Sequence, residues 1–318
     1  MRRCLYCYGP LGEDKSEFHS ACSRKIFGTP NPPELPYSED QMLQLAEKVV
    51  KSQTTVTGVQ PKLSLHLEKL AKKDQPQRFT IVGLWGGYIL KPPTKQYKFL
   101  PELEDLTMHL AEISGIDVVP HSLIRLRSGK LSYITRRIDR INEAKIHMED
   151  MCQLTERLTE QKYNGSHEQI GKAIIRYSTN PGLDIINFFE QVVFSFLTGN
   201  ADMHLKNFSL FERPGLGYVL SPAYDMVASS LVVEGDEEDL ALTLNGKKKK
   251  FKKKDFLEAI NRFDIDAKAI ENMFDKFRKA EELWHKFIDL SFLPDDIKGS
   301  FHDLIKERVS RVYSKKDS

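Results

Sequence analysis

The sequence of 318 residues is long enough for one large domain or two smaller ones, and its apolar fraction of 40% can build a core. Its 47 basic and 45 acidic residues leave a net charge of +2, so the composition as a whole favours binding neither to DNA nor to membrane. There is no uncharged apolar run of 18 or more residues and no signal-like N-terminus, so we expect a soluble, cytoplasmic protein with four reduced cysteines.

The first 25 residues contain four possible metal ligands, Cys4, Cys7, His19 and Cys22, spaced C-x2-C-x11-H-x2-C. Two close pairs of thiol and imidazole groups suit tetrahedral Zn²⁺, and four protein ligands would make such an ion structural. The alternative is a set of reduced structural cysteines beside a surface histidine. A Pro-rich segment, GTPNPPELPYS, then predicts an extended linker, so residues 1–30 are expected to form a zinc-binding-like element and linker.

Residues 31–140 are rich in strand patterns. A helix is expected over 39–52, where Ser38 and Gln41 form a capping-box pattern. Strand patterns follow over 54–66, and QRFTIVGLWGGYILKPP predicts a further β pair. The segment 101–115 predicts an amphipathic helix, and HSLIRLRSGK and LSYITRRIDR predict two more strands.

Residues 141–318 are mostly helical by pattern. Helices are expected in the segments 166–178, 184–199, 254–263, 269–290 and 295–314, with one β hairpin over 207–225 that turns at RPGLG. A β-rich half joined to a helical half predicts a two-lobed α+β fold.

Polar side chains crowd the segment GNADMHLKNFSL, residues 199–210, directly after an apolar helix that Gly199 ends. We expect Asp202 in a loop, Asn207 at the opening of a strand, and Asp225 at the close of the hairpin. Protein kinases use this D-x4-N spacing, followed by a second Asp. A carboxylate can accept the proton of the attacking hydroxyl, and Asn and Asp oxygens suit Mg²⁺, while Lys206 can offset phosphate charge. The alternative is a polar turn that caps a buried helix, and the hairpin ending in Asp225 favours phosphoryl transfer.

A kinase also needs a lysine on a strand. The segment GGYILKPP places Lys91 at a strand end, where Glu104 on the next helix could pair with it, although Glu102 is equally available. A solvated lysine is the alternative. The segment TTVTGVQPK lacks both Gly-rich phosphate-binding motifs and by spacing predicts only a turn.

Together the blocks TVTGVQPKLSL, YILKP, RRIDR, EDMCQL, GNADMHLKNFSL and LSPAYDM resemble the HipA family of serine/threonine kinase toxins, and in particular its short HipT-like members. The resemblance runs from about Thr54 to the C-terminus. It implies a protein-kinase-like fold, with a β-rich N-lobe over 31–140 and a helical C-lobe over 141–318, that binds ATP and Mg²⁺.

The resemblance also implies a role for each motif residue. Asp202 would be the catalytic base, Asn207 and Asp225 would hold Mg²⁺, and Lys91 would contact the ATP phosphates. The other nucleotide-binding positions would be Thr57, Gly58, Val59, Gln60, Pro61 and Lys62 in the nucleotide loop, Arg136, Arg137 and Ile138 in the hinge near adenine, and His204, Lys206 and Tyr224. In the family a serine of the nucleotide loop is autophosphorylated, and here Thr55 and Thr57 stand at the corresponding positions.

The partners implied by the resemblance are an aminoacyl-tRNA synthetase as substrate and a HipB-like helix-turn-helix antitoxin, with DNA contacted through that antitoxin. For short members a small, separately encoded protein resembling the N-terminal subdomain is a further expected partner.

The role of the lysine run and two alternative functions remain open from the sequence. The run GKKKKFKKKDF can bind phosphate backbones or form a solvated loop. The alternative functions are a small-molecule phosphotransferase and a zinc-bearing nucleic-acid-binding protein with a degenerate kinase domain. Intact Asp202, Asn207, Asp225 and Lys91 argue against degeneracy.

Overall fold

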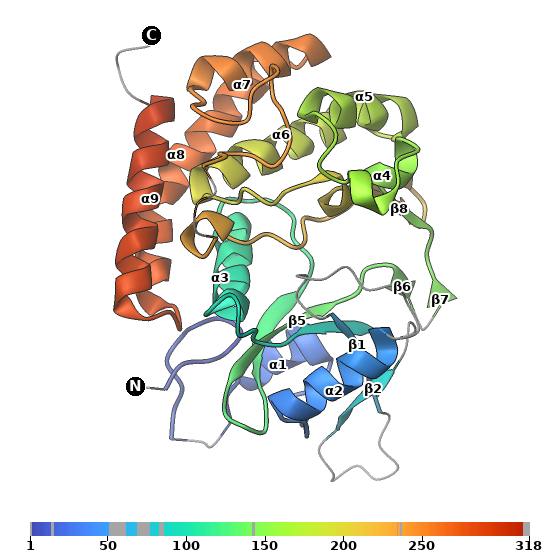
Figure 1. Ribbon diagram of the computed structural model, residues 1–318, viewed down its shortest axis with the longest axis vertical. Coiled ribbons are helices and arrows are strands. Elements are labelled where there is room, and N and C mark those ends of the chain that lie inside the picture. The colour runs from blue at the N-terminus through green and yellow to red at the C-terminus, as the bar shows by residue number, and fades with distance from the viewer. Residues whose placement is uncertain are drawn as a thin grey trace. The chain divides into compact units, whose positions relative to one another are not determined.

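The structure is a computed structural model that describes residues 2–13, 16–50, 62–68, 77–82, 86–141, 144–233, 235 and 237–313 (Figure 1). The chain divides into two compact units. Unit 1 comprises Met1–Asp105, Val119–Ala144 and Leu290–Phe292, and unit 2 comprises Leu106–Val118, Lys145–Asp289 and Leu293–Ser318. None of the helices within the described residues combines the length and the apolar character that a membrane span requires.

Most of the predicted nucleotide loop, Thr57, Gly58, Val59, Gln60 and Pro61, lies outside the described residues, whereas Lys62 is described and exposed. The expected autophosphorylation position Thr55 also lies outside the described residues.

Unit 1 contains a five-stranded antiparallel sheet with the order β2-β1-β3-β5-β4. Its strands are β1 (Leu63–Leu67), β2 (Phe79–Val82), β3 (Tyr88–Lys91), β4 (His121–Arg125) and β5 (Leu131–Arg136). The sequence located these strands, but the predicted pairing of β2 with β3 is wrong. Both strands pair with β1, so that Leu65 lies opposite Ile81 on one side and Tyr88 on the other.

Aromatic side chains pack one face of this sheet against α1 (Ser20–Phe27). Phe27 lies 5.8 Å from Phe79, and Phe79 lies 5.2 Å from Tyr88, measured between ring centroids. These edge-on contacts add to the free energy gained by burying the rings. Helix α1 ends at Gly28, whose φ of 76° lies in the left-handed region.

The segment between α1 and α2 (Glu39–Val50) lies along strand β2. The backbone N–H of Phe79 donates to the carbonyl oxygen of Glu34 at 3.0 Å, so the predicted linker is extended and hydrogen-bonded to the sheet. At the start of α2 the backbone N–H of Ser38 donates to Oε1 of Gln41 at 2.9 Å, which confirms the predicted capping interaction.

Helix α3 (Leu100–Ile113) confirms the second predicted helix. It is buried along most of its length, including the polar side chains of Glu104, Asp105 and Thr107. Buried polar groups need partners, so these positions call for specific hydrogen bonds.

Unit 2 is mainly helical. Its helices are α4 (Met151–Leu154), α5 (His167–Tyr177), α6 (Pro181–Thr198), α7 (Lys253–Ile260), α8 (Ala267–Leu290) and α9 (Asp295–Tyr313), and 3₁₀ turns cover Thr159–Gln161, Leu205–Asn207, Ser229–Leu231 and Asn261–Phe263. Helix α6 is apolar nearly all round and packs against α5 and α9. Its Phe194 meets Trp284 of α8 edge-on at 5.8 Å, which explains why this helix is buried.

The predicted hairpin is formed by β9 (Ser209–Arg213) and β10 (Gly217–Leu220), and β8 (Met148–Asp150) completes a sheet with the order β10-β9-β8. A two-residue ribbon, β6 (Arg140–Ile141) with β7 (Ala144–Lys145), precedes it. The expectation that Asn207 opens the strand is wrong. Asn207 ends a 3₁₀ turn, and β9 begins two residues later.

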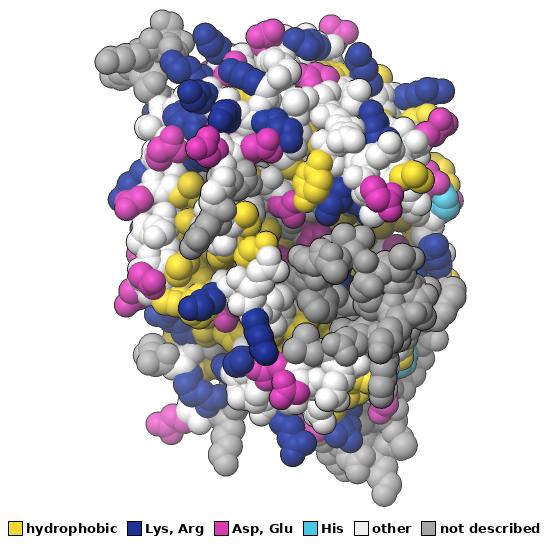
Figure 2. Space-filling view, in the orientation of Figure 1, with side chains coloured by type: hydrophobic (Ala, Val, Ile, Leu, Met, Phe, Trp, Pro, Cys, Tyr) yellow, Lys and Arg dark blue, Asp and Glu magenta, His cyan; other side chains and the backbone are white. Residues whose placement is uncertain are grey.

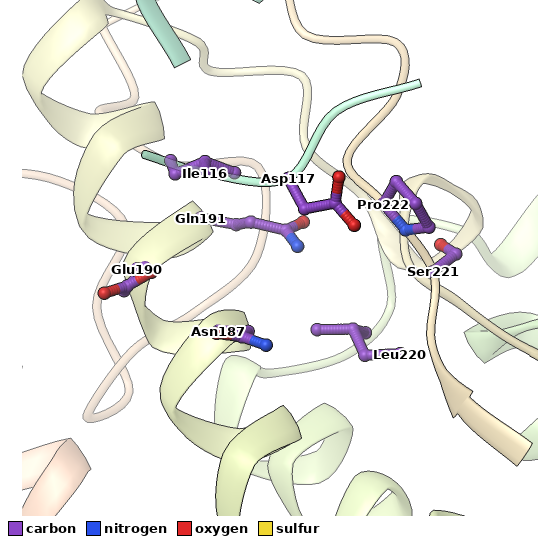
Figure 3. Close-up of a pocket in the computed structure, with 8 residues that line it drawn as sticks. All are labelled: Ile116, Asp117, Asn187, Glu190, Gln191, Leu220, Ser221 and Pro222. Atoms are coloured by element: carbon purple, nitrogen blue, oxygen red, sulfur yellow. The ribbon is translucent and has the colours of Figure 1, made fainter. Parts of the chain in front are cut away.

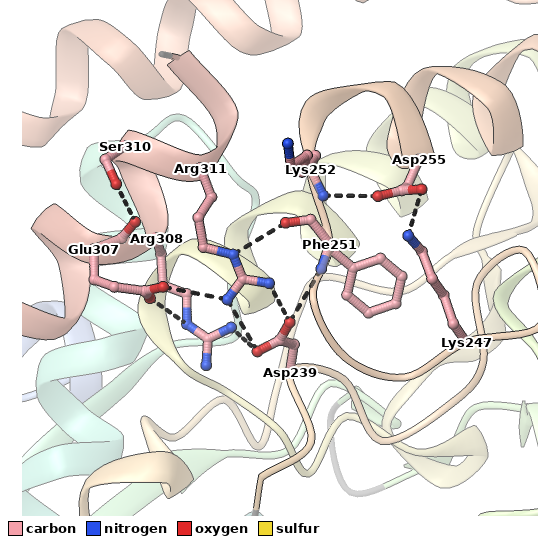
Figure 4. A network of polar contacts seen from close by, with 9 residues as sticks. All are labelled: Asp239, Lys247, Phe251, Lys252, Asp255, Glu307, Arg308, Ser310 and Arg311. Carbon is pink, nitrogen blue, oxygen red and sulfur yellow. Dashed lines mark hydrogen bonds and ion pairs between the residues drawn. The ribbon is translucent and has the colours of Figure 1, made fainter. Parts of the chain in front are cut away.

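A buried carboxylate, Asp239, fixes the C-terminal helix to the loop before α7 (Figure 4). It accepts hydrogen bonds from the guanidinium groups of Arg308 and Arg311 on α9, and from the backbone N–H of Phe251 at 3.2 Å. Two cations offset the cost of burying this charge.

The lysine run lies beside this network. Three of its side chains pair with carboxylates at N–O distances of 2.6–3.0 Å: Lys247 with Asp255, Lys248 with Glu238 and Lys249 with Glu237. On the face shown in Figure 2, dark blue Lys and Arg side chains lie among magenta Asp and Glu side chains. Local pairing of this kind favours the interpretation of the run as a solvated surface segment.

Candidate active site

The backbone of the polar segment after α6 is held by a glycine conformation and by hydrogen bonds. Gly199 ends the helix with a φ of 69°, and a Cβ built there would lie 2.5 Å from Cδ2 of Leu304. Position 199 therefore favours glycine for its conformation, and a larger residue would also have to displace the end of the Leu304 side chain. The next residues are also held, since the N–H of Ala201 donates to Oγ of Ser229 at 2.9 Å.

Asp202 is half-buried in this loop and has a partner that the sequence did not reveal. The hydroxyl of Tyr163 donates to Oδ1 of Asp202 at 2.6 Å. The loop is joined to the same region by the N–H of Leu205, which donates to the carbonyl oxygen of Lys162 at 3.1 Å. The carboxylate is thus oriented by a phenol from a segment 39 residues earlier in the chain.

Lys206 forms an ion pair with Asp150, with 2.5 Å between Nζ and Oδ2. Asp150 also caps helix α4, because its Oδ1 accepts from the backbone N–H of Gln153 at 3.0 Å. Asp150 was not among the predicted site residues. The pair fixes the position of the Lys206 ammonium, and it already offsets part of that charge.

Asn207 lies next to Asp225. Its Nδ2 donates to the backbone carbonyl oxygen of Asp225 at 3.4 Å. Its Oδ1 is buried and has no hydrogen-bond partner among the described residues. A buried carbonyl oxygen without a partner carries a desolvation cost that a bound cation would remove, so this atom fits a ligand of Mg²⁺.

Tyr224 supports the same arrangement. Its hydroxyl donates to the backbone carbonyl oxygen of Lys206 at 3.0 Å and forms a hydrogen bond with Oγ of Ser209 at 2.5 Å. Asp225, the next residue, has a φ of 61°, which is uncommon for a residue other than glycine. Such backbone strain is often found at functional sites.

His204 is buried in the same loop. Burial lowers its pKa to about 4, against the opposing effect of the Asp202 charge, so the imidazole is neutral at pH 7. His204 therefore adds no positive charge to the loop.

In unit 1, Lys91 lies at the end of β3 and forms an ion pair with Glu104 of α3, with 2.5 Å between Nζ and Oε1. This confirms the predicted pairing and selects Glu104 over Glu102. Lys91 is 4% exposed and Glu104 is 2% exposed, so the solvated-lysine alternative is wrong. Burial raises the pKa of Glu102 to about 7.

The predicted hinge residues follow β5. Arg136 ends the strand and is exposed, and the backbone N–H of Arg137 donates to the carbonyl oxygen of Gly87 at 2.9 Å. The guanidinium of Arg137 is occupied by Asp139, at 2.7 Å between Nη2 and Oδ2. Ile138 is half-buried.

A small cavity in unit 2, shown in Figure 3, does not provide the nucleotide site. It measures about 40 Å³ and is lined by Ile116, Asp117, Asn187, Glu190, Gln191, Leu220, Ser221 and Pro222. Pockets for ligands of nucleotide size are roughly 300–1,000 Å³, so this cavity can hold at most water.

The four predicted zinc ligands come together in unit 1. The ligand atoms of Cys4, Cys7, His19 and Cys22 all lie within 4.8 Å of one another.

The sequence profile of the HipA-like C-terminal domain matches residues 54–284. The chain belongs to this family. The matched range includes the polar loop, the hairpin, and the pair formed by Lys91 and Glu104. The zinc-ligand cluster lies outside it.

Several proteins with similar sequences have been named as kinases. The protein Y4dM of Sinorhizobium fredii, named as an inferred kinase, is 35% identical over 208 residues, or 61% of this chain and 49% of that protein. An inferred kinase from Haemophilus influenzae is 28% identical over 295 residues and 82% of each chain. The serine/threonine-protein kinase toxin HipA of Shewanella oneidensis is 28% identical over 215 residues, or 61% of this chain and 47% of the toxin. The chain thus spans about half the length of the Sinorhizobium and Shewanella relatives.

A solved structure has a similar fold. HipA of Shewanella oneidensis, determined with HipB and operator DNA, aligns with a TM-score of 0.66 at 20% identity and covers 84% of this chain and 70% of that chain. This similarity confirms the predicted two-lobed, kinase-like α+β fold.

Proposed function

We propose that this HipA-family chain is an ATP- and Mg²⁺-dependent kinase that phosphorylates serine or threonine hydroxyls of proteins. The main observation in support is the arrangement in unit 2 of Asp202, Asn207 and Asp225 around one short hairpin. The hydrogen bond from Asn207 to Asp225 joins two positions that are 18 residues apart in the sequence.

Asp202 is the proposed general base. The acceptor hydroxyl loses its proton to the Asp202 carboxylate while its oxygen forms a bond to the γ-phosphorus of ATP. The bond between that phosphorus and the β,γ-bridging oxygen breaks, and ADP leaves with the electron pair. Tyr163 is the proposed positioning residue, because its hydroxyl donates to Oδ1 of Asp202 at 2.6 Å and so orients the carboxylate.

Asn207 and Asp225 are the proposed Mg²⁺ ligands. The buried Oδ1 of Asn207, which has no partner among the described residues, supports this role, as does the hard oxygen chemistry of both side chains. When bound, the ion would neutralise charge that develops on the phosphate oxygens.

Two lysines are proposed to contact the phosphates. Lys91 is held by Glu104 in the manner of the strand lysine and helix glutamate of kinases. Lys206 is held by Asp150 and would face the transferred group. Each ion pair limits the rotamers of a flexible side chain, so less entropy is lost when ATP binds.

We further propose a toxin role in a toxin–antitoxin system, with a HipB-like partner, an aminoacyl-tRNA synthetase as substrate, and autophosphorylation on Thr55 or Thr57. The relationship to Shewanella HipA, whose solved structure contains HipB and operator DNA, supports the partner. The family resemblance supports the substrate and the autophosphorylation. Intact mass after incubation with ATP tests the latter, since one added phosphate per chain is expected, and peptide mapping should assign it to the peptide that contains Thr55 and Thr57.

The central experiment compares Asp202→Asn with wild type and with Asp303→Asn as a matched control. Asp303 is an exposed carboxylate on α9, with a side chain 83% exposed, outside the proposed site. Asp202→Asn should lower phosphate transfer by roughly 10²–10⁴-fold, the usual scale for loss of a general base, while ATP affinity stays near the wild-type value. Asp303→Asn should change neither.

The choice of acceptor separates the competing functions. Transfer of ³²P to proteins supports the proposal, whereas transfer only to small alcohols would indicate a small-molecule phosphotransferase. A chain that transfers to neither while binding nucleic acid would indicate a degenerate kinase domain. Wild-type transfer rates in Asp202→Asn would refute the role given to the polar loop.

A further inference from the structure

Backbone hydrogen bonds hold the residues of the N-terminal Cys/His cluster close together. The N–H of Tyr8 donates to the carbonyl oxygen of Cys4, and the N–H of Cys4 donates to that of Gly9, both at 2.9 Å. This tight turn brings Cys4 and Cys7 to the same side. His19 is the N-cap residue of α1, and Cys22 follows three residues later in the first turn of the helix.

The distances within the cluster match those of a tetrahedral site. The Nδ1 atom of His19 lies 3.4 Å from Sγ of Cys7 and 3.8 Å from Sγ of Cys22. A tetrahedral ion with Zn–S of about 2.3 Å and Zn–N of about 2.0–2.1 Å separates sulfur and nitrogen ligands by about 3.6 Å. His19 and two of the three sulfur atoms are thus already spaced for one ion, and the ligand atoms of all four residues lie within 4.8 Å of one another.

The orientation of the imidazole gives a second, independent observation. The Nε2 atom of His19 lies 3.0 Å from the carbonyl oxygen of Pro10, which makes Nε2–H the donor and leaves the lone pair on Nδ1. Metal-binding histidines commonly donate their other ring N–H to a backbone carbonyl in this way. The lone pair of Nδ1 then faces the sulfur atoms.

We propose that Cys4, Cys7, His19 and Cys22 bind one Zn²⁺ ion as a structural site. Three thiolates and one imidazole select Zn²⁺ over Mg²⁺ or Ca²⁺, which prefer oxygen ligands. Four protein ligands leave no position for substrate, so the ion is not catalytic. This site is independent of the proposed kinase chemistry.

The ion would order a segment that is attached to the sheet of unit 1. The carbonyl oxygen of Leu5, between the first two ligands, accepts from the backbone N–H of Leu123 at 3.2 Å and from Oγ of Ser122 at 3.1 Å. The hydroxyl of Tyr8 donates to Oδ2 of Asp105 at 2.8 Å. Because a segment this short cannot form its own core, a metal ion is a common means of fixing such contacts.

The test is zinc content of the full-length chain purified without chelator, measured by elemental analysis. About one equivalent per chain is expected. Cys7→Ser and Cys22→Ser should each lower the zinc content about tenfold or more, whereas Cys152→Ser, which changes the fourth cysteine outside the cluster, should leave it unchanged. His19→Cys should retain zinc, because four thiolates also bind it, and His19→Ala should not.

A second measurement tests the site in wild-type protein, so that it remains informative if the cysteine variants do not fold. Wild-type protein stripped of metal and titrated with Co²⁺ should show thiolate-to-cobalt charge-transfer absorption, which His19→Cys should shift. Less than about 0.1 zinc per chain after loading and desalting, absence of this absorption, or full zinc content in both serine variants would overturn the proposal.

Discussion

Removal of Glu104 tests the buried ion pair that positions Lys91. The variant Glu104→Ala leaves the Lys91 ammonium in a site where the wild-type side chain is only 4% exposed. Loss of one partner from a buried pair typically costs about 3–5 kcal/mol in the free energy of unfolding. We expect a loss in this range by urea denaturation, followed through the tryptophan fluorescence and circular dichroism of the whole chain.

The same variant should also impair catalysis. Without its carboxylate partner, Lys91 loses the ion pair that orients it toward the ATP phosphates in the proposed mechanism. Misplacement of a catalytic group by about 1 Å can cost about 10²-fold in rate, so we expect kcat/KM for ATP to fall by about that factor. Initial rates of ³²P transfer at varied ATP concentration measure it.

A double variant separates the two effects. In Lys91→Met with Glu104→Leu both charges are replaced by apolar groups of similar size, which is often neutral or stabilising. We expect the free energy of unfolding to return to within about 1 kcal/mol of the wild-type value while phosphate transfer stays low, since the lysine is absent. If Glu104→Ala unfolds with wild-type free energy and has wild-type kcat/KM, the role given to the pair is wrong.

Three further perturbations test other contacts. Burial raises the pKa of Glu102 from 4.5 to about 7, so the folded state binds more protons than the unfolded state between these values, and its stability falls as the pH rises through them. In urea denaturation, the free energy of unfolding of Glu102→Gln minus that of wild type should therefore be about 1–3 kcal/mol larger at pH 8 than at pH 4.5. The same difference at both pH values would contradict this. Tyr163→Phe should lower kcat about tenfold and leave the KM for ATP unchanged, because it removes the hydrogen-bond donor to Asp202, the proposed general base. An unchanged kcat would contradict the positioning role of Tyr163. Gly199→Ala should lower the free energy of unfolding by about 2–3 kcal/mol, because position 199 has a positive φ and the new Cβ would contact Leu304. The control Gly215→Ala, at φ 80° with nothing within 4 Å of its Cβ, should cost only about 1 kcal/mol. Equal melting temperatures for the two variants would show that the contact with Leu304 does not matter.

Features set by neighbouring residues could be predicted from the sequence. The cap formed by Ser38 and Gln41 depends on a spacing of three residues, and the structure contains it. The hairpin over β9 and β10 follows from strand patterns on both sides of a Gly-rich turn. The ligand spacing of the Cys/His cluster is equally local, which is why four positions within 19 residues were sufficient to predict it.

Features set by tertiary contacts could not be predicted in the same way. Tyr163 meets Asp202 across 39 residues, and Asp150 meets Lys206 across 56, with no periodic pattern to relate them. Similarly, the alternation of apolar and polar residues in a strand predicts which face is buried but not which strand is its neighbour in the sheet. The position of β1 between β2 and β3 was therefore not predicted. Lys91 had two carboxylates within reach by spacing, and only packing around α3 selects Glu104.

The contacts of the N-terminal element imply an order of events during synthesis. The four proposed metal ligands, Cys4, Cys7, His19 and Cys22, lie within 19 residues of one another in the sequence, so binding of one ion would close only short loops and involve little loss of chain entropy. Its attachment points come much later: Tyr8 meets Asp105 across 97 residues, and the carbonyl oxygen of Leu5 meets Ser122 across 117. The element could therefore bind the proposed ion before the sheet of unit 1 has been synthesised, and its contacts with that sheet would form afterwards.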